Sequence, residues 1–267
     1  MTRIIAIANQ KGGVGKTTTS INLAASLAAT RKRVLLIDMD AQGNATMGSG
    51  IDKHDLKLTV LEVLLGENSL KEAIVNAGET KYDLLPANAN LTAAKVSLLQ
   101  KDDREFQLRN QLAPVQDNYD YILIDCPPSL DMLTVNALVA AKTVLIPMQC
   151  EYFALEGLSD LVETIDAISH SANPDLRLEG LLRTMFDPRS RLAREVSDQL
   201  SIHFGDKLYR SVIPRNVRLA EAPSYGQAIF DYDRRSKGAT AYLALAGEFI
   251  RRHRALDKRQ KTQPALA

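Results

Sequence analysis

The sequence of 267 residues lacks tryptophan, contains two cysteines and has 5% aromatic residues. The cysteines, Cys126 and Cys150, each follow an apolar run, so we expect small buried side chains and no disulfide framework. No segment approaches the run of about 18 apolar residues that spans a bilayer. The first residues lead directly into an apolar run, without the pattern of a signal peptide. These absences predict a cytoplasmic protein.

The charge is almost balanced overall but is distributed unevenly. A formal net charge of +1 does not by itself predict affinity for nucleic acid. Residues 174–267, however, contain 18 Lys or Arg against 11 Asp or Glu, whereas the preceding residues contain 15 against 21. A solvated surface is the commoner explanation for any single charge, but this asymmetry indicates a basic face in the last third of the chain.

Apolar runs alternate with amphipathic segments along most of the chain, which has 45% hydrophobic residues. This alternation predicts an α/β fold with a mostly parallel twisted sheet covered by helices on both faces. We expect one domain over residues 1–254, ending in a helix over 240–254, and a basic, flexible tail over 255–267. Residues 52–118 are expected to be mostly helical, with a short strand around Leu84. Buried strands are predicted at residues 4–8, 33–38, 121–125, 143–147 and 178–185. A helix is expected to start at residues 187–189, with Leu192, Val196 and Leu200 facing inward.

The stretch KGGVGKT, residues 11–17, lies between the first strand and a helical pattern. Its glycines lack the β-carbon that would keep a polyanion away from the backbone, so successive N–H groups can turn towards phosphate oxygens. The following helix adds its positive N-terminal end. Lys16 supplies an ammonium group for the β and γ phosphates, and the Thr17 hydroxyl is the expected magnesium ligand. The loop is a deviant phosphate loop, because Gln10 replaces the usual first glycine and Lys11 adds a cation.

Carboxylates follow two of the predicted strands. Asp38 ends the strand over 33–38, Asp40 follows on a glycine-containing loop, and Asp125 ends the strand over 121–125. In open α/β sheets ligands bind at the carboxyl ends of the strands, and phosphate-loop nucleotidases hold a magnesium-side carboxylate in this way. An isolated aspartate would more often cap a helix or end a strand. Combined with the glycine loop, the pattern predicts a site for a nucleotide with β and γ phosphates and for Mg²⁺.

The motifs together resemble the ParA/Soj-type partitioning ATPases of the MinD/ParA group. They are the deviant loop, the segments DMDAQGNAT and YILIDCPPS, the helix after PMQCEYFALEG, and VIPRNVRLAEAPSYG. The resemblance extends from residue 4 to about residue 250. The chain is similar to the short, chromosome-type members, since no residues precede the first strand that could form an N-terminal helix-turn-helix region.

This resemblance implies a slow ATPase that forms an ATP-dependent sandwich dimer. Lys11 is implied to reach the nucleotide of the partner copy, Lys16 to serve the nucleotide of its own copy, and Asp40 to orient or deprotonate the attacking water. Thr17 and Asp125 are implied to hold Mg²⁺. A second cation near developing phosphate charge would act like an arginine finger. The implied nucleotide-binding residues are Lys11, Gly12, Gly13, Val14, Gly15, Lys16, Thr17 and Thr18 and, around the adenine, Met185, Pro214, Arg215 and Asn216.

The resemblance further implies that the dimer binds double-stranded DNA without sequence preference, through Arg189 and Arg218. Attraction to the phosphate backbone needs only clustered cations. The implied partner is a ParB-like centromere-binding protein that stimulates hydrolysis and thereby releases the DNA. We therefore expect a nucleoid-associated protein that acts in chromosome or plasmid segregation.

Two alternatives belong to other functional classes. A MinD-like positioning ATPase would lie on lipid through a C-terminal amphipathic helix, but the helix over 240–254 is expected to bury its apolar face within the domain, so no membrane contact is expected. An electron-transfer protein similar to nitrogenase iron protein would share a cluster between cysteines of two copies. Cys126 and Cys150 do not match the ligand pattern of that family.

Overall fold

Eight strands form one sheet in the computed structural model, which describes residues 2–77, 82–152 and 154–262. The strand order is β3-β4-β2-β5-β1-β6-β7-β8, with parallel pairing except between β3 and β4. The strands are β1 (Arg3–Ile7), β2 (Val34–Asp38), β3 (Val75–Asn76), β4 (Asp83–Leu85), β5 (Tyr121–Asp125), β6 (Thr143–Gln149), β7 (Arg177–Phe186) and β8 (Leu208–Pro214).

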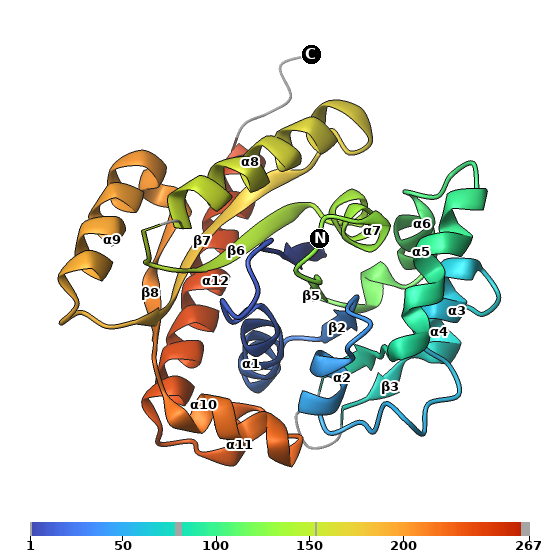
Figure 1. Ribbon diagram of the computed structural model, residues 1–267, viewed down its shortest axis with the longest axis horizontal. Helices are drawn as coiled ribbons and strands as arrows, with labels where there is room; N and C mark the ends of the chain where they lie inside the picture. The colour runs from blue at the N-terminus through green and yellow to red at the C-terminus, as the bar shows by residue number, and fades with distance from the viewer. Residues whose placement is uncertain (1, 78–81, 153, 263–267) are drawn as a thin grey trace.

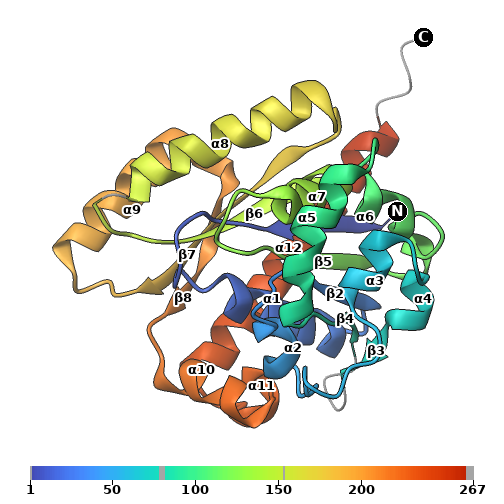
Figure 2. The ribbon, with the colours of Figure 1, turned by 45° about the vertical axis from the view of Figure 1, so that its right-hand side comes forward.

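Helices connect the strands and cover the sheet (Figure 1). Figure 2 shows α8 above the strands and α1 and α2 below them. The helices are α1 (Lys16–Ala29), α2 (Asn44–Gly48), α3 (Val60–Leu65), α4 (Leu70–Ala73), α5 (Ala94–Ser97), α6 (Gln107–Leu112), α7 (Met132–Ala140), α8 (Ala154–Ser171), α9 (Arg191–Phe204), α10 (Val217–Glu221), α11 (Ile229–Tyr232) and α12 (Lys237–Thr262).

The alternation of side chains along β1 divides the apolar interior into two cores. Ile4 and Ala6 are buried in a cluster with residues of α7 and α8, while Ile5 and Ile7 are buried in a second cluster with residues of α1 and α12. Both faces of the strand are therefore buried, which explains its uninterrupted apolar run. The predicted α/β sheet with helices on both faces is confirmed.

The central position of β1 determines where a ligand can approach. β1 lies between β5 and β6, and β2 lies on the other side of β5. The chain after β1 turns towards β2, whereas β6 continues the sheet in the opposite direction, so the carboxyl ends of β5, β1 and β6 form a topological switch point. The glycine loop leaves β1 at this edge.

The predicted strands are present with shifts of one or two residues at their ends, but two features near the C-terminus differ from the predictions. Strand β8 was not predicted, because its exposed Arg210 interrupts the apolar pattern. The helix expected to start at residues 187–189 begins at Arg191, after Ser190 accepts a hydrogen bond from the backbone N–H of Ala193. Leu192, expected to face inward, is 45% exposed in the first turn of that helix.

The last helix is longer than the predicted 240–254, because residues 255–262, expected to belong to the basic tail, continue α12. Asp257 in this extension forms an ion pair with Arg3, and His253, one turn before it, is buried against Glu179. The rest of the predicted tail, residues 263–267, lies outside the described residues. Neither α12 nor any other described helix is long and apolar enough to cross a membrane.

The region between β2 and β5 contains less continuous helix than the sequence indicated. Short α-helices and 3-10 turns alternate there, and the predicted strand around Leu84 is β4. α3 and α4 each begin with a capping box, in which a serine or threonine hydroxyl and a glutamate three residues later satisfy backbone donors. Residues 78–81 in this region lie outside the described part.

Candidate active site

The glycine loop between β1 and α1 is exposed at residues 11–13. Gly13 and Gly15 have φ values of +73° and +87°, in the left-handed region that favours glycine. Gly15 is the N-cap of α1 and makes no side-chain cap hydrogen bond, and the first turn of the helix contains no acidic residue. The N-terminal end of α1 therefore offers N–H groups and a positive dipole end to an anion.

The side chain of Lys16, at the start of α1, reaches back to the beginning of the loop. It is largely buried, with 7% of the residue exposed, and its Nζ donates a hydrogen bond to the carbonyl oxygen of Lys11 at 3.1 Å. Burial lowers the pKa of Lys16, while the nearby carboxylate of Asp125 opposes that shift. An ammonium group held by a carbonyl oxygen can move to a phosphate oxygen, which is a stronger acceptor.

Asp125 at the end of β5 is fully buried and bonds to the first turns of α1. Its two carboxylate oxygens accept hydrogen bonds from Thr17 Oγ1 at 2.8 Å and from Ser20 Oγ at 2.7 Å. Burial and the neighbouring Asp38 raise its pKa. The Thr17 hydroxyl and the Asp125 carboxylate are oxygen donors of the kind that Mg²⁺ prefers, alongside phosphate oxygens and water. The described residues contain no cluster of three or more His, Cys, Asp or Glu that could hold a metal by itself.

Asp38 and Asp40 have different surroundings. Asp38 lies opposite Asp125 in the register of β2 and β5, is fully buried, and accepts hydrogen bonds from Thr46 and from the backbone N–H of Asp40. Burial also raises its pKa. Asp40 is half-buried at the sheet edge, where Oδ1 accepts a bond from the backbone N–H of Gln42 at 3.0 Å. Asp38 was located from the sequence but was given no role there; in the structure it anchors the loop that carries Asp40.

Lys11 projects from the exposed side of the loop. Its Nζ lies 2.6 Å from Oε2 of Glu151, and both side chains are about half exposed. An exposed ion pair of this kind contributes little stability, on the order of 0 to 1 kcal/mol. The ammonium group of Lys11 can therefore leave Glu151 for another anion at small cost.

The residues expected around an adenine lie at the ends of β7 and β8. Met185 has a φ of +49°, which is unusual for a residue with a side chain. Phe186, the next residue, is paired in register with Pro214. Arg215 is exposed, and Asn216 caps α10 by accepting a hydrogen bond from the backbone N–H of Leu219. The structure thus brings Met185 and Pro214 to the same end of two adjacent strands.

The two arginines expected to bind DNA are exposed and already have acidic neighbours. Arg189 forms a two-pronged contact with Asp187, at 3.0 Å from Nε and 2.9 Å from Nη2. Arg218 on α10 lies 2.8 Å from Glu221. Each arginine is therefore available at the surface but must exchange an intrachain partner for a phosphate.

Two side chains that contact the glycine loop were not predicted from the sequence. Thr184 near the end of β7 and Gln149 at the end of β6 donate hydrogen bonds to carbonyl groups of the loop. Gln149 lies in the segment PMQCEYFALEG, but nothing in that segment indicates a contact with the loop, and the bonds from Thr184 and Gln149 span 170 and 136 positions of the chain. No local feature of the sequence could have identified them.

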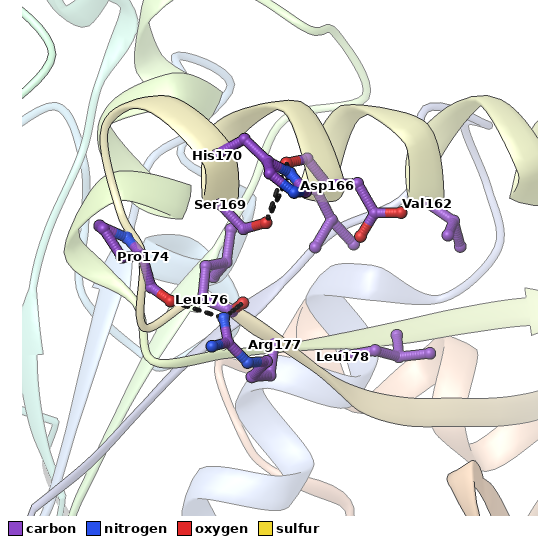
Figure 3. Close-up of a pocket in the computed structure, with 9 residues that line it drawn as sticks. Val162, Asp166, Ser169, His170, Pro174, Leu176, Arg177 and Leu178 are labelled. Carbon is purple, nitrogen blue, oxygen red and sulfur yellow. Dashed lines mark hydrogen bonds between the residues drawn. The ribbon is translucent and has the colours of Figure 1, made fainter.

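A cavity of about 330 Å³ lies away from this edge, between the C-terminal half of α8 and the start of β7 (Figure 3). Its polar groups mostly bond to nearby backbone: Arg177 donates to the carbonyl oxygens of Pro174 and Leu176, and His170 Nδ1 lies 2.7 Å from the carbonyl oxygen of Asp166. The opposite edge holds the glycine loop and the carboxylates. The chemistry therefore favours the loop, not the larger cavity, as the active site.

The cysteines do not favour a shared metal cluster. Cys126 and Cys150 are free and buried, at the carboxyl ends of β5 and β6. Burial raises the pKa of both thiols, which disfavours the thiolate form that binds metals. Buried side chains cannot meet those of a second copy without rearrangement.

Comparison with known proteins agrees with this geometry. A family model described as an AAA domain matches residues 2–178. The chain is 52% identical to the chromosome partitioning protein ParA of Myxococcus xanthus, covering 94% of this chain and 88% of that protein. It is 51% identical to the sporulation initiation inhibitor protein Soj of Bacillus subtilis, covering 93% of this chain and 98% of that protein.

Two solved structures have the same architecture. Cobyrinic acid a,c-diamide synthase from Mycobacterium smegmatis, with bound ADP and magnesium, has a TM-score of 0.83 and 38% identity, covering 95% of this chain and 96% of that one. The cell division ATPase MinD from Pyrococcus furiosus has a TM-score of 0.76 and 26% identity, covering 94% and 99%. With these relatives and the glycine loop and carboxylates at one sheet edge, the chain belongs to the ParA/Soj family of P-loop partitioning ATPases.

Proposed function

We propose that this chain is an ATP-driven partitioning switch. ATP with Mg²⁺ binds at the glycine loop, two copies pair across the nucleotides, and the dimer binds DNA without sequence preference. Hydrolysis, stimulated by a ParB-like centromere-binding partner, separates the copies and releases the DNA. The observation that carries this proposal is the convergence of the loop, Lys16, the Thr17–Asp125 pair and Asp40 at one edge of the sheet.

The residues at this edge fit a magnesium nucleotide. A β-carbon added at Gly12 or Gly13 would meet no described atom within 4 Å, so this side of the loop is open to a bulky anion. The Thr17 hydroxyl and the Asp125 carboxylate are already 2.8 Å apart. When bound, Mg²⁺ and ATP supply the phosphoanhydride bond to be broken and a cation that neutralises phosphate charge.

In this proposal each side chain has one task. Lys16 moves from the carbonyl of Lys11 to the β and γ phosphate oxygens, and Thr17 and Asp125 hold the metal side of the site. Asp40 orients the attacking water or accepts its proton, since it is the half-buried carboxylate at the edge. Met185 and residues 214–216 surround the adenine. Residues 1–254 act as one ATPase domain.

Pairing of two copies would complete the site. Within the described part of the chain, the ammonium group of Lys11 is held by an exposed ion pair with Glu151. In the dimer it exchanges this carboxylate for the nucleotide of the partner copy, where a second cation stabilises the charge that develops during hydrolysis. In a single copy no Lys11 from a partner reaches the nucleotide, so we expect it to hydrolyse ATP slowly.

DNA association is assigned to Arg189 and Arg218 and to the excess of basic residues in the last third of the chain. Both arginines are exposed, and phosphate contacts need no base readout. DNA binding would place the protein on the nucleoid. The ParB-like partner is proposed from family membership, because the partitioning proteins at about half identity carry the ParA and Soj names.

The test combines oligomeric state with DNA binding. Purified protein with Mg²⁺ and a non-hydrolysable ATP analogue should double its mass in light scattering and bind random duplex DNA, whereas ADP should support neither. If two arginines from each copy neutralise about four phosphates, log K should fall against log salt with a slope near −3.6. A protein that stays monomeric when saturated with the analogue would contradict the proposal. Adding a ParB-like protein and DNA should then raise the ATPase rate.

The MinD-like alternative is tested in the same experiment with vesicles. α12 places its apolar side inside the domain, where Phe249 stacks on Tyr209 at 4.8 Å between ring centroids. It is therefore not free to enter a lipid surface. Sedimentation with anionic vesicles in ATP, together with no affinity for DNA, would favour the alternative.

A further inference from the structure

Two side chains from neighbouring strands hold carbonyl groups of the glycine loop. Thr184 on β7 donates from Oγ1 to the carbonyl oxygen of Val14 at 2.7 Å, and Gln149 on β6 donates from Nε2 to the carbonyl oxygen of Gly13 at 3.0 Å. Thr184 is 2% exposed, so water cannot take the place of the Val14 carbonyl as the acceptor for its hydroxyl. The loop is thus tied to the sheet from the side of β6 and β7.

These bonds determine the direction of two backbone donors. A trans peptide group is planar, and its C=O and N–H point in opposite directions. Holding the carbonyl of Val14 against Thr184 therefore turns the N–H of Gly15 away from β7. Holding the carbonyl of Gly13 against Gln149 turns the N–H of Val14 away from β6. A phosphate loop binds its anion through N–H groups of this kind.

Packing holds the side chain of Val14, which is 1% exposed, but it does not restrain the two glycines before it. A β-carbon at Gly12 or Gly13 would enter open space, and Gly13 and Gly15 have positive φ values that only glycine adopts without strain. Glycine peptide planes reorient easily, so in the absence of outside contacts the donors would sample many directions. The two side-chain bonds reduce that freedom before any ligand arrives, which is preorganisation in the usual sense.

The backbone at the end of β7 supports the same arrangement. Met185 adopts a φ of +49° directly after Thr184, and its Sδ lies 3.2 Å from Nε2 of Gln149. A side-chain-bearing residue in this conformation persists only where surrounding contacts hold it. Gln149 therefore links Met185 to Gly13, so the end of β7 is connected to the loop directly through Thr184 and indirectly through Met185 and Gln149.

We infer that Thr184 and Gln149 are positioning residues that orient the N–H groups of Gly15 and Val14 towards the phosphates of the nucleotide. The inference rests on the proposed nucleotide site. Because neither side chain needs to contact the nucleotide, their effect is on its affinity and acts on ADP as well as on ATP. Lys11 and Asp40, by contrast, are assigned to hydrolysis.

The experiment compares Thr184→Val, which keeps the shape and removes the donor, with Thr184→Ser, which keeps the hydroxyl. Calorimetry measures the Kd of ADP and of a non-hydrolysable ATP analogue with Mg²⁺, and heteronuclear NMR without nucleotide reports the amide resonances of Val14 and Gly15. Thr184→Val should weaken both nucleotides by about tenfold, the equivalent of one net hydrogen bond. It should also shift the Gly15 amide. Thr184→Ser should keep the wild-type Kd of both nucleotides and the wild-type Gly15 amide resonance.

Two further variants keep the result unambiguous. Gln149→Met removes the second donor at a half-buried position and should weaken both nucleotides and shift the Val14 amide. Thr164→Val is the control, because the Thr164 hydroxyl bonds to the carbonyl of Asp160 within its own helix; it should change nothing. Wild-type affinities and loop amide shifts in Thr184→Val and Gln149→Met would overturn the inference while leaving the proposed function intact. Wild-type protein that binds neither nucleotide would overturn both.

Discussion

Nε2 of His253 lies 3.0 Å from Oε1 of Glu179, which stands near the amino end of β7, and both side chains are buried. The pair connects the long last helix to β7. Tyr209 OH donates to the same glutamate oxygen at 2.8 Å, and Tyr121 OH lies 3.3 Å from Nδ1 of the imidazole. A buried glutamate with these partners ties α12 to three strands.

This pair predicts a loss of stability in acid. Burial opposes ionisation of Glu179, but hydrogen bonds from His253, Thr143 and Tyr209 and the charge of His253 outweigh burial and lower the pKa of Glu179 to about 2, from 4.5. A lowered folded-state pKa gives stability that is present above pH 4.5 and is lost as the pH falls towards 2. Glu179→Gln should remove this pH dependence, worth about 3 kcal/mol at most.

Urea titrations from pH 7 to pH 3 measure this difference. The free energy of unfolding should fall more steeply with acid in the wild type than in Glu179→Gln. The matched control is Glu156→Gln, since Glu156 is exposed on α8. Parallel curves for the wild type and Glu179→Gln would show that the glutamate does not titrate as assigned.

Gly50 and Gly226 form a close backbone contact that predicts a large effect of a single methyl group. A β-carbon on Gly226, whose φ is +63°, would lie 2.6 Å from Cα of Gly50. Gly226→Ala should lower the free energy of unfolding by about 2 kcal/mol or more, through the left-handed backbone and the overlap. Gly157→Ala is the control, because Gly157 lies within α8 with no described atom within 4 Å of its added methyl group. It should stabilise by about 0.5 to 1 kcal/mol.

Thermal denaturation without nucleotide distinguishes the two glycines. At about 2 to 4 °C per kcal/mol for a chain of this size, the two alanine variants should move the melting temperature in opposite directions. Equal shifts would mean that the contact between the two loops is looser than its geometry indicates.

The two lysines of the loop should fail in different ways. Lys16→Ala removes the buried ammonium group and should weaken nucleotide binding by about tenfold to a hundredfold, as expected for a charge-assisted hydrogen bond. Lys11→Ala should leave the nucleotide affinity of the isolated copy unchanged but prevent the ATP-dependent increase in mass. Calorimetry and light scattering on the same samples separate these effects. A Lys11→Ala protein that still dimerises and hydrolyses normally would contradict the role assigned across the dimer.

Asp40→Ala should bind ATP but not hydrolyse it. Loss of one well-placed electrostatic group costs on the order of 3 kcal/mol, a hundredfold or more in rate. Asp52→Ala is a matched control, because Asp52 accepts a backbone hydrogen bond two residues ahead, as Asp40 does. Single-turnover assays at saturating ATP measure the step directly. Wild-type hydrolysis by Asp40→Ala would remove Asp40 from the mechanism.

Arg218→Ala should weaken ATP-dependent DNA binding equally for all sequences. Each phosphate that is no longer neutralised reduces the magnitude of the salt slope by about 0.9. The dimer of the variant lacks Arg218 in both copies, so the slope should become shallower by about 1.8. Arg109→Ala is the control, since Arg109 is exposed on α6, on the opposite side of the molecule from α10 (Figure 1). Anisotropy titrations across salt give both slopes. An unchanged slope in Arg218→Ala would assign the DNA interaction to other cations.

The sequence alone determined the local parts of this protein. The apolar runs predicted the central strands, because residues buried on both faces of a parallel sheet form uninterrupted apolar segments. The glycine loop and Lys16 lie within a dozen residues, so their chemistry could be predicted from their spacing. Asp125 could be located because it ends a buried strand next to that of the loop.

Only the tertiary structure decided the parts that depend on distant residues. The bonds from Thr184 and Gln149 to the loop, and the link between His253 and Glu179, join residues 74 to 170 positions apart. The same kind of long-range contact extends α12 beyond the point where its apolar periodicity ends. Hydrophobic periodicity reports which face of a segment is buried, but it carries no information about which distant polar group a buried donor will meet.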